Sequence, residues 1–188
     1  MQLETERLVL RDFVIEDALD LAACRHGEAF WRYYEVEDDI AGQAREHVAM
    51  FVAWQDDQPR THFQLAIVLK ADRRVIGSCG IRQRPQVQYG VSSPGEADIG
   101  YELDPAQWRQ GYATEAVERL VAFGFGELRL HRVWAFCLLE NTASWRVMER
   151  LGMRREGVLQ SNVWMRARWW DTVVYALLAE EWRSKRET

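Results

Sequence analysis

The sequence predicts an α+β fold in which helices flank and interrupt one mixed, mostly antiparallel sheet. Segments of alternating apolar residues, typical of strands, recur along the chain, and four segments with helical apolar spacing separate them. One helix pair follows the first strand, and the other two helices lie between later strands. The 188 residues are 48% hydrophobic and 12% aromatic, which suits a single globular domain, residues 1–188, with a substantial core.

The first half of the chain contains strand and helix signals separated by polar turns. The segment from Phe30 to Asp39 is aromatic and then acidic, and is predicted to be irregular. The segment from Arg82 to Glu96 is polar and contains Pro and Gly, so it is predicted to be a long loop. The predicted elements are strand 7–13, helix 15–24, helix 40–54, and strands 63–69 and 75–81.

The stretch from Ala97 to Ala116 predicts a strand, a tight turn and the start of a helix. Alternation of apolar residues from Ile99 to Leu103 predicts a half-buried strand, which Asp104-Pro105 ends. Apolar residues then follow at helical spacing from Ala113 to Phe125. The remaining predicted elements are strand 131–139, helix 142–151, and strands 154–163 and 172–178, with no internal repeat.

The turn from Gln107 to Gly111 has the features of an anion-binding site. It precedes a helix whose first backbone N–H groups have no intrahelical acceptor, and Gly111 allows close approach of the backbone to a ligand. Convergent N–H donors and the positive end of the helix dipole favour phosphate. The chain lacks the Gly-Lys-Ser/Thr sequence of a P-loop and the further glycine and acid of a dinucleotide fingerprint. A structural turn is the alternative interpretation.

Several motifs of this chain resemble those of GCN5-related N-acetyltransferases, the GNAT superfamily. The spacing Trp108-x-x-Gly111-x-Ala113, followed by Thr114-Glu115-Ala116, resembles the pyrophosphate-binding motif of that superfamily. The blocks Asn141–Ser144 and Leu151–Gly157 resemble its ribosomal-protein N-terminal alanine acetyltransferase (RimJ/RimL-like) branch. Further matches are Leu3–Leu8, Asp171–Tyr175 and Glu181-Trp182, so the resemblance covers nearly the whole chain.

The resemblance implies a GNAT acyl-CoA N-acyltransferase fold, in which the strands ending near Leu103 and Leu139 splay apart, and acetyl-CoA as cosubstrate. The pyrophosphate is expected against the turn, the pantetheine arm along Tyr101 to Asp104, and an amide contact from Asn141, which can also cap a helix. Arg109 can offer a cation to a phosphate, or be solvated surface. The implied cofactor-binding residues are Tyr101, Leu103, Asp104, Arg109, Gln110, Gly111, Tyr112, Ala113, Thr114, Asn141 and Ser144.

The reaction that this resemblance implies is direct attack of an amine on the thioester, with no acyl-enzyme. A lysine-type amine, with a pKa of about 10.4, must first lose a proton, so a carboxylate is useful. Alternation places three carboxylates on one strand face, opposite the face of Ile99, Tyr101 and Leu103. They are Glu96, Asp98 and Glu102. Glu102 is the first candidate base, with a solvent-facing role as the alternative, and Asp98 is the second. Ser144 is the candidate for protonating or orienting the departing thiolate, because the helix after Asn141 lacks a Tyr at 146–149.

The acceptor stays open between a peptide N-terminus and a small-molecule amine. The resemblance puts it near Phe30–Asp39, the loop 82–96 and the strands around Asn162–Trp170, where aromatic and acidic residues could hold a cation. Most of these aromatics could equally be core. Some relatives carry a carboxylate where Gln160–Val163 has none, which puts a ribosomal-protein acceptor in doubt. A non-catalytic acyl-CoA-binding regulator and a ribosome-associated scaffold are the alternatives to an enzyme.

Composition limits the partners and the compartment. The formal net charge of -5, with a pI near 5.5, argues against a DNA partner. Cys24, Cys79 and Cys137 are odd in number and lie among apolar residues, which favours reduced, buried thiols over disulfides or a metal site. No apolar segment predicts a signal peptide or a membrane span, so we expect a cytoplasmic protein. Edge strands could support a homodimer, which the sequence does not decide.

Overall fold

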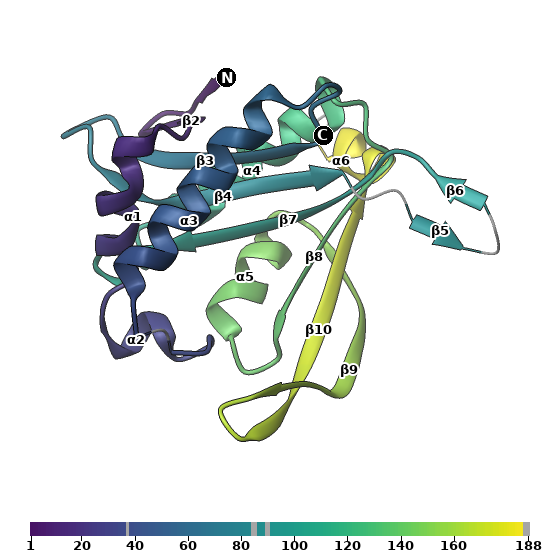
Figure 1. Ribbon diagram of the computed structural model, residues 1–188. Coiled ribbons are helices and arrows are strands. Elements are labelled where there is room, and N and C mark those ends of the chain that lie inside the picture. The colour runs from purple at the N-terminus through teal and green to yellow at the C-terminus, as the bar shows by residue number, and fades with distance from the viewer. Residues whose placement is uncertain (37, 84–85, 89–90, 186–188) are drawn as a thin grey trace. The chain divides into compact units, whose positions relative to one another are not determined.

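The computed structural model describes residues 1–36, 38–83, 86–88 and 91–185 (Figure 1). The chain divides into two compact units: residues 1–82 with 100–120, and residues 83–99 with 121–188. Strand β7 (Glu96–Leu103) and helix α4 (Tyr112–Gly126) each begin in one unit and end in the other. The bounds of α4 confirm the predicted helix 113–125 to within one residue at each end.

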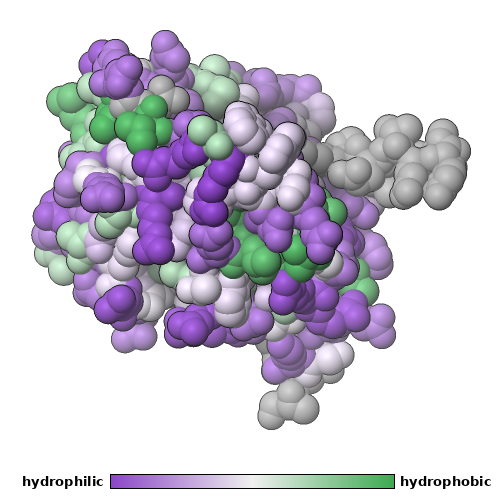
Figure 2. Space-filling view, turned by 90° about the horizontal axis from the view of Figure 1, so that it is seen from below, coloured by the Kyte–Doolittle hydropathy of each residue, from purple (hydrophilic) through white to green (hydrophobic). Residues whose placement is uncertain are grey.

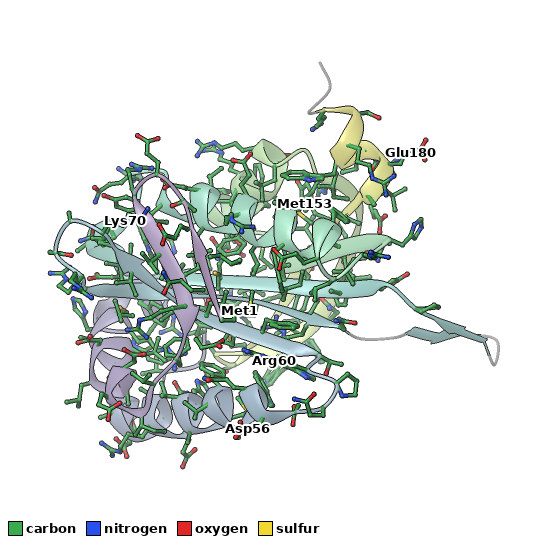
Figure 3. The ribbon with its side chains drawn as sticks, turned by 90° about the horizontal axis from the view of Figure 1, so that it is seen from above. Met1, Asp56, Arg60, Lys70, Met153 and Glu180 are labelled. Atoms are coloured by element: carbon green, nitrogen blue, oxygen red, sulfur yellow. The ribbon has the colours of Figure 1, made fainter. Side chains whose placement is uncertain are left out.

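The first unit contains the strands β1 (Gln2–Glu4), β2 (Leu8–Asp12), β3 (His62–Leu69) and β4 (Val75–Gln83) and the second half of β7, in the order β1-β2-β3-β4-β7. The pairs from β1 to β4 are antiparallel. Strand β1 was not predicted, because three residues are too few to show alternation. Met1 and Arg60, both labelled in Figure 3, bind the same carboxylate. Asp12 on β2 accepts hydrogen bonds from Arg60 at 2.6 and 3.1 Å and from the amine of Met1.

Helices α1 (Ala18–Cys24) and α3 (Ile40–Ala53) lie side by side across one face of β3 and β4, with the short 3-10 turns η1 (Ile15–Asp17) and η2 (Trp54–Asp56) before and after them (Figure 1). Asp39 caps α3 by accepting from the Gly42 N–H at 2.7 Å. The buried core under these helices consists of Phe13, Ala18, Leu21, Ala44, Val48, Phe51, Ala66, Val68 and Val75.

Part of the segment predicted as irregular is helical. Helix α2 (Gly27–Trp31) includes Phe30 and Trp31, which are 5% and 7% exposed and pack edge to face. Burial of these two rings stabilises a helical turn that the local sequence does not signal. Tyr34 stacks on Phe30 but keeps 42% of its surface exposed.

The second unit is built on β8 (Arg132–Leu138), β9 (Arg154–Met165) and β10 (Arg168–Leu178), in the order β7-β8-β10-β9 with the first half of β7. Helices α5 (Thr142–Arg150) and α6 (Ala179–Ser184) pack on β10. Strands β9 and β10 are longer than predicted because Arg166 and Ala167, at φ 53° and 57°, form the tight turn of a hairpin. The buried side chains of this unit include Val133, Ala135, Val147, Met148, Leu151, Val173, Tyr175, Leu177 and Trp182.

The predicted loop 82–96 is wrong in part. Strand β4 continues to Gln83, and β5 (Gln86–Gln88) pairs antiparallel with β6 (Val91–Ser93). These strands are three residues each, and their mostly polar sequences resemble those of loops. Residues 84–85 and 89–90 of the predicted loop lie outside the described residues.

Hydrogen-bonded neighbours follow one another in the strand order β1-β2-β3-β4-β7-β8-β10-β9, which makes a mixed and mostly antiparallel sheet. The predicted fold class is confirmed. Strands β7 and β8 form a parallel pair through Glu96–Asp98 and Arg132–Trp134. The pairing between the two strands ends there, although β7 continues to Leu103 and β8 to Leu138.

Candidate functional site

The turn before α4 has the backbone geometry of an anion cradle. Arg109 and Gly111 both have positive φ, 63° and 84°. The first helical hydrogen bond runs from the Glu115 N–H to the Gly111 carbonyl at 3.0 Å. The N–H groups of residues 112–114 therefore have no acceptor within the helix. A Cβ atom at Gly111 would lie 3.3 Å from Arg7 Nη2, so a side chain there would be both strained and crowded.

Arg7 and Glu115 hold this turn in place. The Glu115 carboxylate accepts from Arg7 Nε at 2.7 Å, from the Arg7 N–H at 2.8 Å and from Thr5 Oγ1 at 2.6 Å. Arg7 Nη1 donates to the Gln110 carbonyl at 2.9 Å, and the guanidinium lies 4.5 Å from the ring centre of Tyr112. We call the set Thr5, Arg7 and Glu115 the turn clamp.

Lys70 fixes the N-terminal side of the turn clamp. Its ammonium donates to the Thr5 carbonyl at 2.7 Å and to Glu4 at 3.0 Å (Figure 3). The motif Leu3–Leu8, which the sequence offered only as a resemblance, therefore has a structural role within the first unit. It positions the turn from which the helix starts.

Thr114 provides a polar group that the fold leaves unsatisfied. Its Oγ1 is buried and has no hydrogen-bond partner among the residues that the structure describes. A buried hydroxyl without a partner carries a desolvation penalty of about 1–3 kcal/mol. A phosphate-bearing ligand at the start of α4 fits this group, as it fits the N–H groups beside it.

The end of β7 offers fewer backbone groups to a ligand than the sequence suggests. The Leu103 carbonyl accepts from Trp108 Nε1 at 2.9 Å, and the Asp104 N–H donates to the Ile76 carbonyl at 2.8 Å. The Asp104 carboxylate accepts from the Ala106 N–H at 2.8 Å and begins the 3-10 turn η3 (Pro105–Gln107). A peptide-like arm along β7 would thus find the Leu103 carbonyl and the Asp104 N–H already bound within the chain.

Glu102 is part of a buried ion pair, so the solvent-facing alternative is wrong. Its two carboxylate oxygens accept from Arg25 Nη2 at 2.7 Å and Nε at 3.2 Å, with side-chain exposures of 13% and 6%. Ser78 Oγ donates to the same carboxylate at 3.0 Å. Arg25 Nη1 lies 2.8 Å from His47 Nδ1 and 3.2 Å from Gln43 Oε1. The sheet and two helices thus hold this carboxylate in one orientation.

Asn141 and Ser144 lie together at the start of α5 in the second unit. Asn141 caps the helix, because its Oδ1 accepts from the Ser144 N–H at 3.2 Å. The cap uses Oδ1, and the Nδ2 group of the same amide has two N–H donors that the cap does not use. Burial raises the pKa of the Cys137 thiol, and hydrogen bonds from Ser144 and Trp145 lower it in part.

The other two carboxylates of the β7 stretch have different surroundings. Asp98 is 4% exposed and lies beside Trp134 in the parallel pair. Glu96 is partly buried and accepts from Arg132 Nη1 at 3.5 Å. The three carboxylates that alternation assigned to one strand face therefore differ in burial, and Asp98 is the most buried of them.

The aromatic residues considered for an acceptor divide into two groups. Trp31 and Trp170 are buried, at 7% exposure each, as expected of core. Trp164 and Trp169 are 59% and 57% exposed and pack edge to face, 5.4 Å between ring centres, on the β9–β10 hairpin. Figure 2 shows one face of the molecule, where apolar residues form separate patches within a hydrophilic surface.

The residues that the structure describes contain no group of three or more His, Cys, Asp or Glu side chains that could hold a metal ion. None of the helices described is long and apolar enough to cross a membrane. All three cysteines are free thiols, and Cys137 is only partly buried.

The turn clamp predicts an acid-sensitive contribution to stability. Burial alone would raise the pKa of Glu115, but hydrogen bonds from Thr5 and Arg7 outweigh it and lower the pKa below the ordinary value of about 4.3. The carboxylate therefore adds stability above the unfolded-state pKa and loses it as the pH falls through the folded-state pKa. We expect the free energy of unfolding to fall more steeply from pH 5 to pH 3 (roughly one unit either side of that value) in the native chain than in Glu115→Gln, measured by urea titration. Equal slopes would contradict this.

Two arginines that bind the site carboxylates could not be identified from the sequence. Arg25 follows α1 as one of many arginines, and only the fold brings it to Glu102. Arg7 stands in a motif that the resemblance matched without giving it a role. A pairing over 108 residues, such as Arg7 with Glu115, cannot be read from local spacing.

Comparison with known proteins gives a consistent result. The family model described as "Acetyltransferase (GNAT) domain" matches residues 7–154. The uncharacterised N-acetyltransferase YoaA of Bacillus subtilis (strain 168) is 32% identical over 177 residues, which cover 94% of this chain and 96% of that protein.

Solved structures share the fold. A GNAT-family acetyltransferase from Bacillus anthracis superposes with a TM-score of 0.80 at 28% identity, covering 96% of this chain and 100% of that one. RimJ of Mycobacterium smegmatis, solved in complex with CoA-disulfide, gives a TM-score of 0.76 at 23% identity, covering 93% and 83%. The second likeness shows a common fold alone.

Proposed function

Because the chain belongs to the GNAT acetyltransferase family, whose general reaction is acetyl transfer to an amine, we propose that it moves the acetyl group of acetyl-CoA to a primary amine. The transfer is a direct attack in a ternary complex, and residues 1–188 act as a single catalytic domain. The observation that carries the proposal is the clamped turn before α4, with its N–H groups open to an anion and Gly111 at φ 84°.

We assign the proposed cofactor-binding roles to residues of each unit in turn. The N–H groups of Tyr112, Ala113 and Thr114, with the Thr114 hydroxyl, would hold the diphosphate, and Arg109 and Gln110 would flank it. The Asn141 amide and the backbone of Tyr101 would bind the pantetheine arm, while Leu103, Asp104 and Ser144 would shape its path. When bound, acetyl-CoA supplies an acyl group activated as a thioester.

Glu102 is the proposed base, and the ion pair with Arg25 defines how it would work. A carboxylate has about four acceptor positions, and Arg25 and Ser78 occupy three of them. The remaining position on Oε2 could take the proton or the hydrogen bond of an acceptor ammonium, directly or through water. Asp98 is the second candidate. Ser144 would donate to the departing thiolate, which needs little assistance because its pKa is about 8.5 if it behaves like a cysteine.

The acceptor class remains a proposal between a protein N-terminus and a small-molecule amine. The resemblance to the RimJ/RimL-like branch favours a protein N-terminus, while the lack of a carboxylate at Gln160–Val163 favours a different amine. The exposed Trp164 and Trp169 are the residues that we propose to contact it. Cytoplasmic location, absence of a DNA partner and a possible homodimer stay predictions of the sequence.

One observation favours a second candidate function. The bidentate ion pair with Arg25 leaves Glu102 little freedom as a base, which suits a non-catalytic regulator that binds acyl-CoA. Such a regulator would bind the cofactor without turnover of any amine.

Calorimetric titration with acetyl-CoA tests the proposal. We expect saturable binding by the native chain and no detectable binding by Gly111→Trp, because the side chain would occupy the cradle at a strained φ. The matched control is Gly126→Ala in α4, where a Cβ atom meets nothing within 4 Å, so binding should be unchanged. Thermal unfolding checks that the Gly111→Trp chain is folded. Thiol release with a panel of amines then separates the enzyme from the regulator, and a native chain that does not bind acetyl-CoA excludes both.

A further inference from the structure

We propose that Arg7 is a positioning residue for the cofactor phosphates: it cancels the charge of Glu115 and fixes the turn, so that the start of α4 can bind a dianionic group. The inference rests on the proposed function and adds a residue that neither the sequence motifs nor the family match assigns to it. It concerns the first unit alone.

Glu115 poses an electrostatic problem for a phosphate site. It lies in the first turn of α4, where its carboxylate and a bound phosphate would compete for the same positive end of the helix. Its side chain is 18% exposed, so water screens its charge less than at an open surface. An uncompensated carboxylate here would repel the ligand that the adjacent N–H groups attract.

Arg7 solves this problem by its position. Its guanidinium makes contacts of 2.7 and 2.6 Å with one oxygen of the Glu115 carboxylate, through Nε and Nη2. The same guanidinium donates to the Gln110 carbonyl at 2.9 Å, which turns that carbonyl dipole toward a cation and fixes the turn. With the Tyr112 ring 4.5 Å away, the group touches the turn on either side of Gly111. The field of such a charge pair falls off faster with distance than the field of Glu115 alone, so the pair repels a nearby phosphate less than the unpaired carboxylate would.

A purely structural role for Arg7 predicts a different pattern of effects. Loss of a structural contact would weaken binding equally at all salt concentrations and would not be repaired by removing Glu115. Loss of charge cancellation gives repulsion, which salt screens, since the Debye length falls from about 30 Å at 0.01 M to about 3 Å at 1 M. Neutralising Glu115 should also remove the repulsion between its carboxylate and the phosphate.

The experiment measures the CoA dissociation constant by calorimetry, at about 0.02 M and about 0.5 M salt, for four chains. They are the native chain, Arg7→Met, Arg7→Met/Glu115→Gln and Arg7→Lys. The control is Arg11→Met, which breaks a comparable bidentate pair with Asp17, at 2.7 and 2.8 Å, on strand β2. Thermal midpoints of all variants show that each is folded.

We expect Arg7→Met to weaken CoA binding by about tenfold or more at low salt and by about threefold at high salt, with Arg11→Met near native. The double variant should bind CoA at least about fivefold more tightly than Arg7→Met, and Arg7→Lys should lie between Arg7→Met and the native chain. If the native chain binds CoA but Arg7→Met matches Arg11→Met, or loses affinity equally at both salts without rescue, the inference is overturned and the proposed function stands. If the native chain itself fails to bind CoA, both are overturned.

Discussion

Replacing Arg25 with Met is expected to lower the free energy of unfolding by about 3–5 kcal/mol, because it leaves the buried Glu102 carboxylate without its partner. The pair is 6% and 13% exposed, and both carboxylate oxygens are bound to the guanidinium. Urea unfolding followed by tryptophan fluorescence measures the change. The matched control is Arg154→Met, which removes a pair with Glu181 whose arginine is 64% exposed and should cost less than about 1 kcal/mol.

The cycle with Glu102→Gln separates the ion pair from the individual side chains. Each single variant leaves one buried group without its counterpart, whereas Arg25→Met/Glu102→Gln removes both charges. The double variant should therefore lose less stability than the sum of the two single ones. Strict additivity would contradict a coupled pair, and losses below 1 kcal/mol would show that water screens it.

The same variants bear on the proposed base. Glu102→Gln should leave the acetyl-CoA dissociation constant unchanged and reduce turnover at neutral pH, once an amine acceptor is known. Unchanged turnover would remove Glu102 from the mechanism and leave its carboxylate as a structural partner of Arg25.

Replacing Gly77 with Ala is expected to destabilise the chain by about 3 kcal/mol or more, because the added methyl has no space. A Cβ atom at this position of β4 would lie 2.1 Å from the Glu102 carbonyl oxygen and 2.9 Å from the Leu103 Cα. These are backbone atoms of the neighbouring strand β7, so they cannot rotate away as a flexible side chain would. The clash would push β7 away from β4 at the residue that carries the candidate base.

Gly157→Ala is the matched control for the glycine prediction. Gly157 also lies in a strand, β9, but a Cβ atom there meets nothing within 4 Å. Its stability should stay within about 0.5 kcal/mol of native in the same urea titration. If Gly77→Ala behaved like this control, β4 and β7 would have to tolerate a wider separation than their contact suggests.

Local signals predicted the framework because helices and strands of ordinary length carry their periodicity in sequence. The stretch from Ala97 to Ala116 became strand, turn and helix nearly as expected, and Gly111 has the positive φ for which glycine is suited. Three-residue strands such as β1 and β5 are too short for a period to emerge. Helix α2 depends on burial of Phe30 and Trp31, which is a tertiary effect.

The sequence likewise predicted some features of the candidate site and missed others. Backbone features tied to a motif, such as the turn before α4 and the cap at Asn141, follow from local spacing. The surroundings of a side chain do not. Alternation placed Glu102 on a face, but Arg25, from 77 residues earlier in the chain, determines that its carboxylate is paired.

The turn clamp also bears on the order in which the candidate site forms as the chain folds. The hydrogen bonds from Arg7 to Glu115 close a loop of 108 residues, a separation that makes their formation a late event compared with the winding of a single helix. Helix α4 can form early, but its first turn takes its final shape only when the N-terminal strand has docked. A ligand that binds the finished turn would therefore hold the two ends of that loop together.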